Sequence, residues 1–250
     1  MRLTRLFHDG PLETGIVVSL SDANSHHLKT VLRSRTGQEL ILFNGKGGEY
    51  LATICEISKK TLSVEIDRYA EVNRESPLSI VLAQGISKGQ RMDYCIQKAV
   101  ELGAHAIQPV ITQRCAVRQK ADRPDRKESH WQGVLTSAAE QSGRTILPLL
   151  ENTASLHDYL HRTTDDSLKL VLDPQADGTL CDLSPPEQSV HILTGPEGGL
   201  SEEEVSQAKD CGFTGIRMGP RILRTETAGI AAIAVMQALW GDLCRKDNSC

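Results

Sequence analysis

The feature that most constrains the fold is a change in the spacing of apolar residues near Pro77. Before it, residues 16–18, 40–43, 50–57 and 61–66 show the patterns of short strands, with turn residues such as Asn44-Gly45-Lys46-Gly47-Gly48 between them. One helix is predicted in this part, over residues 21–35. Residues 1–73 are therefore predicted to form a small, mainly β barrel domain.

Beyond Pro77, strand and helix patterns alternate, which is typical of a parallel sheet covered on both faces. Helices are predicted from Arg91 to Gly103 and from the capping box Ser201-Glu202-Glu203-Glu204 to Gly212. A last helix over residues 225–240 is apolar nearly all round, so it must be buried under the sheet or against a second subunit. Residues 74–250 are thus predicted to be an α/β domain, with strands over residues 78–84, 106–111, 168–172, 190–194 and 213–218.

Composition excludes several classes of protein. Hydrophobic residues make up 39% of the chain, enough for a folded core, but no apolar run approaches the roughly 18 residues of a membrane span. The start, Met1-Arg2-Leu3-Thr4-Arg5, lacks a secretory signal, so a cytoplasmic protein is expected. The seven cysteines form no Cys-x-x-Cys pair, and His157 and His161 lack the glutamate of a metalloprotease helix. No metal is expected.

Charge is unevenly distributed along the chain, although the net charge is only -4. Residues 84–145 carry ten Lys and Arg against six Asp and Glu, whereas residues 146–200 carry two against nine. A basic middle is compatible with a face that meets phosphate, and equally with an ordinary solvated surface.

Two loops are candidates for a ligand site because each follows a strand and opens a helix, where open α/β sheets bind ligands. Gly195-Pro196-Glu197-Gly198-Gly199 lets backbone amides approach a ligand closely. The second loop, residues 218–227, combines apolar residues with Arg221 and Arg224. Adenine fits between such walls. A Gly-x-Gly-x-x-Gly after an early strand and a phosphate-binding P-loop are both missing, which disfavours ordinary dinucleotide and nucleoside triphosphate binding.

Four blocks of sequence then resemble the signature of a known family. They are Lys88-Gly89-Gln90-Arg91-Met92-Asp93 with Ile96-Gln97-Lys98 and Glu101-Leu102-Gly103, Glu140-Gln141-Ser142-Gly143-Arg144, the loop Gly195 to Gly199, and Gly219-Pro220-Arg221-Ile222-Leu223-Arg224-Thr225-Glu226-Thr227-Ala228. Together they resemble the RsmE family of 16S rRNA (uridine-N3) methyltransferases in the SPOUT superfamily. Residues 2–7 and His27-Leu28-x-x-Val31-Leu32-Arg33 also resemble the RNA-binding PUA-like domain of that family. The match is thinnest between residues 150 and 189.

The resemblance implies a PUA-like β-barrel at residues 1–73 and a SPOUT methyltransferase domain at residues 74–250 that ends in a trefoil knot, a feature too rare to propose from pattern alone. It implies S-adenosylmethionine as cofactor, a homodimer, and 16S rRNA as substrate. The rRNA is expected to be modified within the assembled small ribosomal subunit. Carried over by position, the cofactor contacts are Leu172, Thr194, Gly195, Pro196, Glu197, Gly199, Met218, Ile222, Leu223 and Thr227.

The implied chemistry assigns roles to charged residues. Uridine N3 is protonated at neutral pH, so Arg221 and Arg224 are expected to stabilise the negative charge that develops on the base. Glu197, Glu140 or water could accept the proton. Because N3 lies on the pairing edge, the base must be unpaired or flipped out. The candidates for RNA contacts are Arg2, Arg5, His8, His27, Arg33, Lys88, Arg91, Arg114 and Arg144.

Three other functions remain open at this point. The first is a SPOUT methylase that acts on transfer RNA or on a ribose oxygen. The second is a non-catalytic RNA-binding assembly factor that keeps only the fold. The third is a nucleotide-linked oxidoreductase, which the missing glycine fingerprint disfavours.

Overall fold

The computed structural model describes residues 3–115, 124–163 and 166–244. The chain forms two compact units: unit 1 runs to Glu75 and takes in Ala139–Leu147, and unit 2 comprises Ser76–Ala138 and the chain from Pro148 onward. The sequence predicted one boundary, between residues 73 and 74. It did not predict the return of Ala139–Leu147 to unit 1, because contacts so distant in sequence leave no local pattern. The carboxylate of Glu75 makes such a contact, accepting a hydrogen bond from the Nε of Arg144 at 2.8 Å.

Unit 1 is built on a five-stranded sheet in the order β1-β3-β4-β5-β2. β1 and β3 are parallel and the other pairs are antiparallel. The strands are β1 (Arg5–Phe7), β2 (Val17–Ser19), β3 (Glu39–Phe43), β4 (Glu49–Ile57) and β5 (Leu62–Ala70). Apolar side chains from β1, β3, β4, β5 and η1, including Leu28, Leu42 and Ile54, form the buried core of this unit, and the half-buried Val18 of β2 packs against it.

The helical part of unit 1 differs from its prediction. Ser21 caps α1 (Asp22–His26) as an ordinary helix start, but the next turn, η1 (His27–Val31), is a π-helix. Arg33 then takes a φ of 52°, and the predicted helix over residues 21–35 therefore ends early. A left-handed arginine costs backbone energy, which sequence patterns do not reveal.

Unit 2 is built on a seven-stranded sheet in the order β12-β10-β11-β6-β7-β8, with β9 also paired to β7. Every pairing is parallel, which confirms the α/β prediction for this part of the chain. The strands are β6 (Ser79–Gly85), β7 (Ala106–Ile111), β8 (Leu149–Leu150), β9 (Ala154–Ser155), β10 (Leu168–Leu172), β11 (Ser189–Thr194) and β12 (Thr214–Ile216). The predicted trefoil knot stays a prediction.

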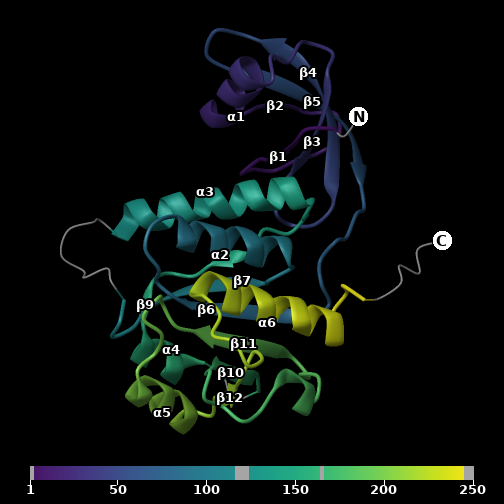
Figure 1. Cartoon of the computed structure of the whole chain (residues 1–250). Helices are drawn as coiled ribbons and strands as arrows, with labels where there is room; N and C mark the ends of the chain where they lie inside the picture. The colour runs from purple at the N-terminus through teal and green to yellow at the C-terminus, as the bar shows by residue number, and fades with distance from the viewer. Residues whose placement is uncertain (1–2, 116–123, 164–165, 245–250) are drawn as a thin grey trace. The chain divides into compact units, whose positions relative to one another are not determined.

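Helices cover both faces of this sheet, with α2 and α6 on one side and α4 and α5 on the other (Figure 1). Ala83 packs in a cluster with Tyr159 of α4 and Ala208 of α5, whereas Leu82, next to it on β6, lies against Gly229 of α6. Both faces of β6 are therefore buried, as expected for a parallel sheet. The helices are α2 (Gln90–Glu101), α3 (Pro124–Ser142), α4 (Leu156–Arg162), α5 (Glu202–Asp210) and α6 (Thr225–Leu239), with a short 3-10 turn η2 (Leu180–Asp182).

Two expectations from composition can be compared with the described residues. Among them, no helix is long and apolar enough to cross a membrane, and no group of three metal-ligating side chains gathers. The apolar helix α6 buries one face, which includes Ile233 and Met236, but leaves Val235 and Leu239 exposed.

Candidate active site at the carboxyl ends of three strands

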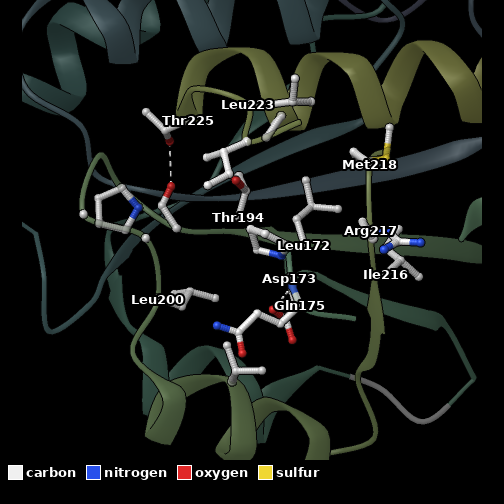
Figure 2. Close-up of a pocket in the computed structure, with 18 of the residues that line it drawn as sticks. Leu172, Asp173, Gln175, Thr194, Leu200, Ile216, Arg217, Met218, Leu223 and Thr225 are labelled. Atoms are coloured by element: carbon white, nitrogen blue, oxygen red, sulfur yellow. Dashed lines mark hydrogen bonds between the residues drawn. The ribbon is translucent and has the colours of Figure 1, made fainter. Parts of the chain in front are cut away.

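A cavity of about 870 Å³ opens at the carboxyl ends of β10, β11 and β12 in unit 2. The loops that follow these three strands form its walls, together with the first turns of α5 and α6 (Figure 2). Its volume lies in the range of ligand sites, roughly 300–1,000 Å³. The position agrees with the rule that open α/β sheets bind ligands outside the carboxyl ends of their strands.

The side chains that line the cavity are mostly apolar on the walls and charged at the edge. Figure 2 shows the apolar set from all three strand ends, namely Leu172, Leu200, Ile216, Met218 and Leu223. Flat apolar surface of this kind suits an aromatic ring such as adenine, and the neighbouring backbone groups supply hydrogen bonds to its edge.

The sequence reading missed Asp173 and Gln175, which follow β10 and line the cavity. The Asp173 carboxylate has a side chain only 13% exposed and lies 3.5 Å from the Nζ of Lys209. Its other oxygen accepts a hydrogen bond from the backbone N–H of Gln175 at 2.9 Å. Their position at a strand end beside Pro174 was the signal that could have found them.

The loop of residues 195–199, called the glycine loop below, is packed backbone against backbone. A Cβ on Gly195 would lie 2.7 Å from the carbonyl carbon of Gly199, and one on Gly85 would lie 2.5 Å from the nitrogen of Pro196. Gly199 itself has a φ of 69°. Only glycine fits these positions, because real Cβ atoms do not approach other atoms so closely.

Glu197 connects the glycine loop to the start of α2. Its Oε1 accepts hydrogen bonds from the backbone N–H of Lys88 at 2.8 Å and from the Nη1 of Arg91 at 2.9 Å. Burial opposes ionisation of this carboxyl, but these hydrogen bonds and the charge of Arg91 outweigh it and hold the pKa of Glu197 below its ordinary value. Glu197 is therefore ionised at neutral pH and is a weak base.

The loop of residues 218–224, called the arginine loop below, is far more exposed. Ile222 is 86% exposed, and the side chain of Arg224 is 80% exposed and lies 4.0 Å from Glu226. Arg221 is also exposed at the cavity. At the start of α6, directly after the arginine loop, the hydroxyl of Thr225 donates a hydrogen bond of 2.6 Å to the carbonyl of Gly195 in the glycine loop, the bond drawn at Thr225 in Figure 2.

All but one of the residues expected to contact a cofactor line this cavity. The exception is Thr227, which is exposed on α6 and lies outside the lining residues. Thr225, two residues earlier, lines the cavity instead. The helix start was placed correctly, but two residues amount to a little over half a helical turn, which points Thr227 away from the cavity, and a motif match cannot resolve this.

Two arginines expected to contact RNA are instead buried within unit 1. Arg5 pairs with Glu49 and donates a hydrogen bond of 2.9 Å to the carbonyl of Arg144. Arg144 in turn is paired with Glu75. Because breaking a buried pair leaves an uncompensated charge, these two side chains have a structural role, and the expectation of direct RNA contact is corrected for both.

The other expected RNA contacts differ in their surroundings. Of the remaining candidates, His27, Arg33 and Lys88 are exposed, and Arg91 and Arg114 are exposed but hold the glycine loop. Arg114 does so by donating to the carbonyls of Gly198 at 3.0 Å and Leu200 at 3.3 Å. His8 is half-buried, and this burial lowers its pKa despite the nearby charge of Asp9. Arg2 lies outside the described residues.

Glu140, another candidate proton acceptor, belongs to unit 1. Its Oε1 accepts a hydrogen bond from the backbone N–H of Phe7 at 2.9 Å. Burial raises the pKa of Glu140, and this effect exceeds the opposing effects of that hydrogen bond and of the charges of His27 and Arg5. Of the two carboxylates, Glu140 is therefore the stronger base.

Comparison with protein families matches both units. The model of an RNA methyltransferase domain matches residues 74–237, and the model of an RNA methyltransferase PUA domain matches residues 20–67. A protein from Buchnera aphidicola of Schizaphis graminum, named ribosomal RNA small subunit methyltransferase E, is 37% identical over 97% of this chain and 98% of its own. A relative of the same name from Bacillus subtilis is 31% identical over 90% and 91%.

Solved structures of similar proteins agree with this match. The ribosomal RNA small subunit methyltransferase E of Neisseria gonorrhoeae, bound to S-adenosylmethionine, is 40% identical, with a TM-score of 0.91 over 97% of this chain and all of that one. A putative methyltransferase from Legionella pneumophila in complex with the same cofactor is also 40% identical, with a TM-score of 0.94 over the same shares. The similarity covers both units of the chain.

Proposed function

Since the chain belongs to the RNA methyltransferase family whose members are named ribosomal RNA small subunit methyltransferase E, we propose that it methylates N3 of a uridine in 16S rRNA. It is an S-adenosylmethionine-dependent enzyme that acts on RNA of the small ribosomal subunit. The observation that carries the proposal is the cavity between the glycine loop and the arginine loop, where apolar walls lie beside exposed cations.

The residues present fit the cofactor. Leu172, Met218 and Leu223 would hold the adenine ring, and backbone groups of the glycine loop would bind the edge of the nucleoside. The carboxylate of Asp173 also lines the cavity and would accept hydrogen bonds from the ribose hydroxyls or the ammonium group of the cofactor. When bound, S-adenosylmethionine supplies a methyl group on a positively charged sulfur.

Arg221 and Arg224 supply the complementary chemistry. Both line the cavity and are exposed, and the ion pair of Arg224 with Glu226 is long at 4.0 Å. An arginine held so loosely is available to a base that enters from solvent. Their charges would stabilise the anion that forms at the uracil oxygens when N3 loses its proton.

The surroundings of Glu197 and Glu140 bear on which group accepts the N3 proton. Glu197 is a weak base with its oxygen committed to Lys88 and Arg91, so its role is to position the glycine loop. Burial raises the pKa of Glu140, but Glu140 belongs to unit 1 and is not among the residues that line the cavity, so Glu140 and water both stay candidates for the proton acceptor. Because positioning alone supplies on the order of 7–11 kcal/mol in well-aligned reactions, the enzyme can work with a modest base.

The RNA substrate would be held by the exposed side chains of His27, Arg33, Lys88, Arg91 and Arg114. Each phosphate neutralised on a single strand should contribute about -0.7 to the slope of log affinity against log salt. Arg91 and Arg114 also hold the glycine loop, so RNA that contacts them would act on the wall of the cofactor cavity. A slope near zero would contradict RNA binding through these residues.

We also propose that the enzyme acts as a homodimer. The helices α2 and α6 pack together, and each exposes apolar side chains: Tyr94 of α2 at 48%, and Val235 at 36% and Leu239 at 48% of α6. Exposed apolar residues on adjacent helices would be buried in an interface. Sedimentation of the wild type and of Leu239→Glu tests this: a dimer for the first and a monomer for the second are expected, and a wild-type monomer would contradict it.

One experiment tests the function as a whole. The purified protein is incubated with labelled S-adenosylmethionine in two separate reactions, one with small subunits and one with naked rRNA, both from a strain that lacks this modification. The label is then mapped by mass spectrometry. Label on N3 of a single uridine is expected, with assembled subunits the better substrate. Label on a ribose oxygen would change the reaction class, and label on neither substrate would refute the function.

A further inference from the structure

A buried glutamine lies directly behind the cavity and has no part in the chemistry described so far. Gln84 is the sixth residue of β6, is 0% exposed and lies outside the residues that line the cavity. Its amide nitrogen donates to the Oγ1 of Thr225 at 2.9 Å, to the carbonyl of Gly85 at 3.0 Å and to the carbonyl of Gly195 at 3.4 Å. One side chain thus contacts both the glycine loop and the first residue of α6.

The amide nitrogen of Gln84, the hydroxyl of Thr225 and the carbonyl of Gly195 are hydrogen-bonded in pairs and form a closed triangle. The hydroxyl of Thr225 donates its proton to Gly195 at 2.6 Å, so it can only accept from Gln84. The carbonyls of Gly85 and Gly195 can also only accept. Together they fix the orientation of the Gln84 amide, with nitrogen toward the loops.

The oxygen of the same amide lacks the hydrogen bonds that the nitrogen makes. The Oε1 of Gln84 is buried and has no hydrogen-bond partner among the described residues. A buried oxygen without a partner costs free energy, whereas an apolar side chain would fill the same space without that cost. The stability of the fold therefore does not explain why a glutamine occupies residue 84, and its hydrogen bonds to Gly195 and Thr225 point to a role in the site.

We propose that Gln84 is a positioning residue that sets the spacing between the glycine loop and the first turn of α6, and so the shape of the S-adenosylmethionine cavity. The inference rests on the proposed cofactor site. Gly195 and Thr225 both line that cavity, and the close approach at Gly85 brings β6 near enough for Gln84 to hold them. Loss of the amide should let the two loops move apart and weaken cofactor binding.

The neighbouring strand offers a matched control. Gln108 on β7 is 2% exposed, and its register partner on β6 is Ala83, next to Gln84. Its amide nitrogen also donates to the carbonyl of the following residue, Pro109, at 2.8 Å, and to a second carbonyl, that of Asn152, at 2.8 Å. Gln108 lies outside the cavity lining and its Oε1 accepts a hydrogen bond from Arg162, so it shares the burial of Gln84 and its pattern of two amide bonds to carbonyls, but not its contacts with Gly195 and Thr225.

The test compares Gln84→Leu with Gln108→Leu in the full chain, by calorimetry with S-adenosylmethionine and by chemical unfolding. Gln108→Leu removes the partner of Arg162 and should lose stability, but only Gln84→Leu should weaken cofactor binding, by about tenfold, the worth of a lost hydrogen-bond pair. The unbranched Gln84→Met serves as the second variant should Gln84→Leu not fold.

A double-mutant cycle makes the test specific to the triangle. Gln84→Leu and Thr225→Val should weaken binding by less together than the product of their separate effects, while Thr225→Ser, which keeps the hydroxyl, should restore affinity. Additive effects, or cofactor affinity within about twofold of wild type in a folded Gln84 variant, would overturn the inference. A wild type that binds no S-adenosylmethionine would instead overturn the cofactor site itself.

Discussion

The two loops that form the active-site cavity are held in opposite ways. The glycine loop is fixed from three directions: Glu197 binds the start of α2, Arg114 binds two of its carbonyls, and Gly85 lies against Pro196. The arginine loop exposes Ile222 and the side chain of Arg224 almost completely. One wall of the cavity is thus built in advance, and the other is left free to adapt.

This difference separates two tasks of the site, binding of the cofactor and stabilisation of the RNA base. A rigid glycine loop suits the cofactor, because preorganised groups bind without an ordering cost. An exposed arginine loop suits an RNA base that must enter from solvent and leave again. Substitution of Arg221 or Arg224 and substitutions in the glycine loop should therefore affect different steps of the reaction.

The largest effect is expected from the arginine loop on the chemical step. Arg224→Ala should lower kcat by about 100-fold to 1,000-fold, the usual loss when one stabiliser of a developing anion is removed. S-adenosylmethionine binding should change little, because the side chain is 80% exposed. Single-turnover rates and calorimetry on the same preparation separate the two quantities.

The control for this prediction is Arg126→Ala, an exposed arginine of α3 outside the cavity lining. It should keep kcat near the wild-type value. An equal loss of cofactor affinity and kcat in Arg224→Ala would mean that Arg224 also holds the cofactor, and the division of tasks would fail.

The next largest effect is expected in the glycine loop, on binding. Gly195→Ala would place a Cβ 2.7 Å from backbone atoms of Gly199 and Leu200, so the loop must open. S-adenosylmethionine affinity should fall by about 10-fold to 100-fold, equivalent to the 1–3 kcal/mol of overpacking. Gly133→Ala in α3, where a Cβ meets nothing within 4 Å, is the control and should leave affinity unchanged.

A smaller effect is expected where Glu197 anchors the glycine loop. Glu197→Gln should weaken cofactor affinity by about fivefold, the upper range for an exposed ion pair. The folded pKa of Glu197 lies below its ordinary value, so its stabilising effect is present above the ordinary carboxyl pKa, about 4.3, and is lost as pH falls through the folded pKa. Between pH 5 and 8 the contribution of Glu197 should be constant.

Glu101→Gln is the matched control for this prediction. Glu101 pairs with Lys98 at 2.8 Å and is 26% exposed, close to the 28% of Glu197, but it lies outside the cavity lining. It should leave cofactor affinity unaltered. If activity instead follows a titration that disappears in Glu197→Gln near pH 6–7, Glu197 is the proton acceptor after all.

The sequence predicted the framework of this site well. The strands at residues 106–111 and 168–172 agree with β7 and β10, and the capping box at Ser201 and Glu204 forms as expected. These features are local: apolar period, a cap, and a glycine at a turn. The same local signals placed both loops of the cavity correctly at the ends of β11 and β12.

What the sequence could not provide depends on contacts between distant residues. Arg5 and Arg224 are both arginines in family blocks, yet one is paired with Glu49 in a buried site and the other is 80% exposed. Gln84 reads as an ordinary residue of a buried strand until Gly195 and Thr225 are brought beside it. Burial and pairing of this kind are properties of the packed chain, so residue type alone assigns the wrong role.

The smallest effect is expected at the tip of the arginine loop. Ile222→Ala should leave the free energy of unfolding within about 0.5 kcal/mol of wild type, because a side chain 86% exposed contributes little to the folded core. Cofactor affinity should still fall by about threefold to fourfold, the worth of one buried methylene, if the loop closes so that Ile222 covers the ligand. Val31→Ala, at an apolar residue of unit 1 that is 62% exposed, should change neither quantity. A cofactor affinity unchanged in Ile222→Ala would show that Ile222 does not cover the bound cofactor.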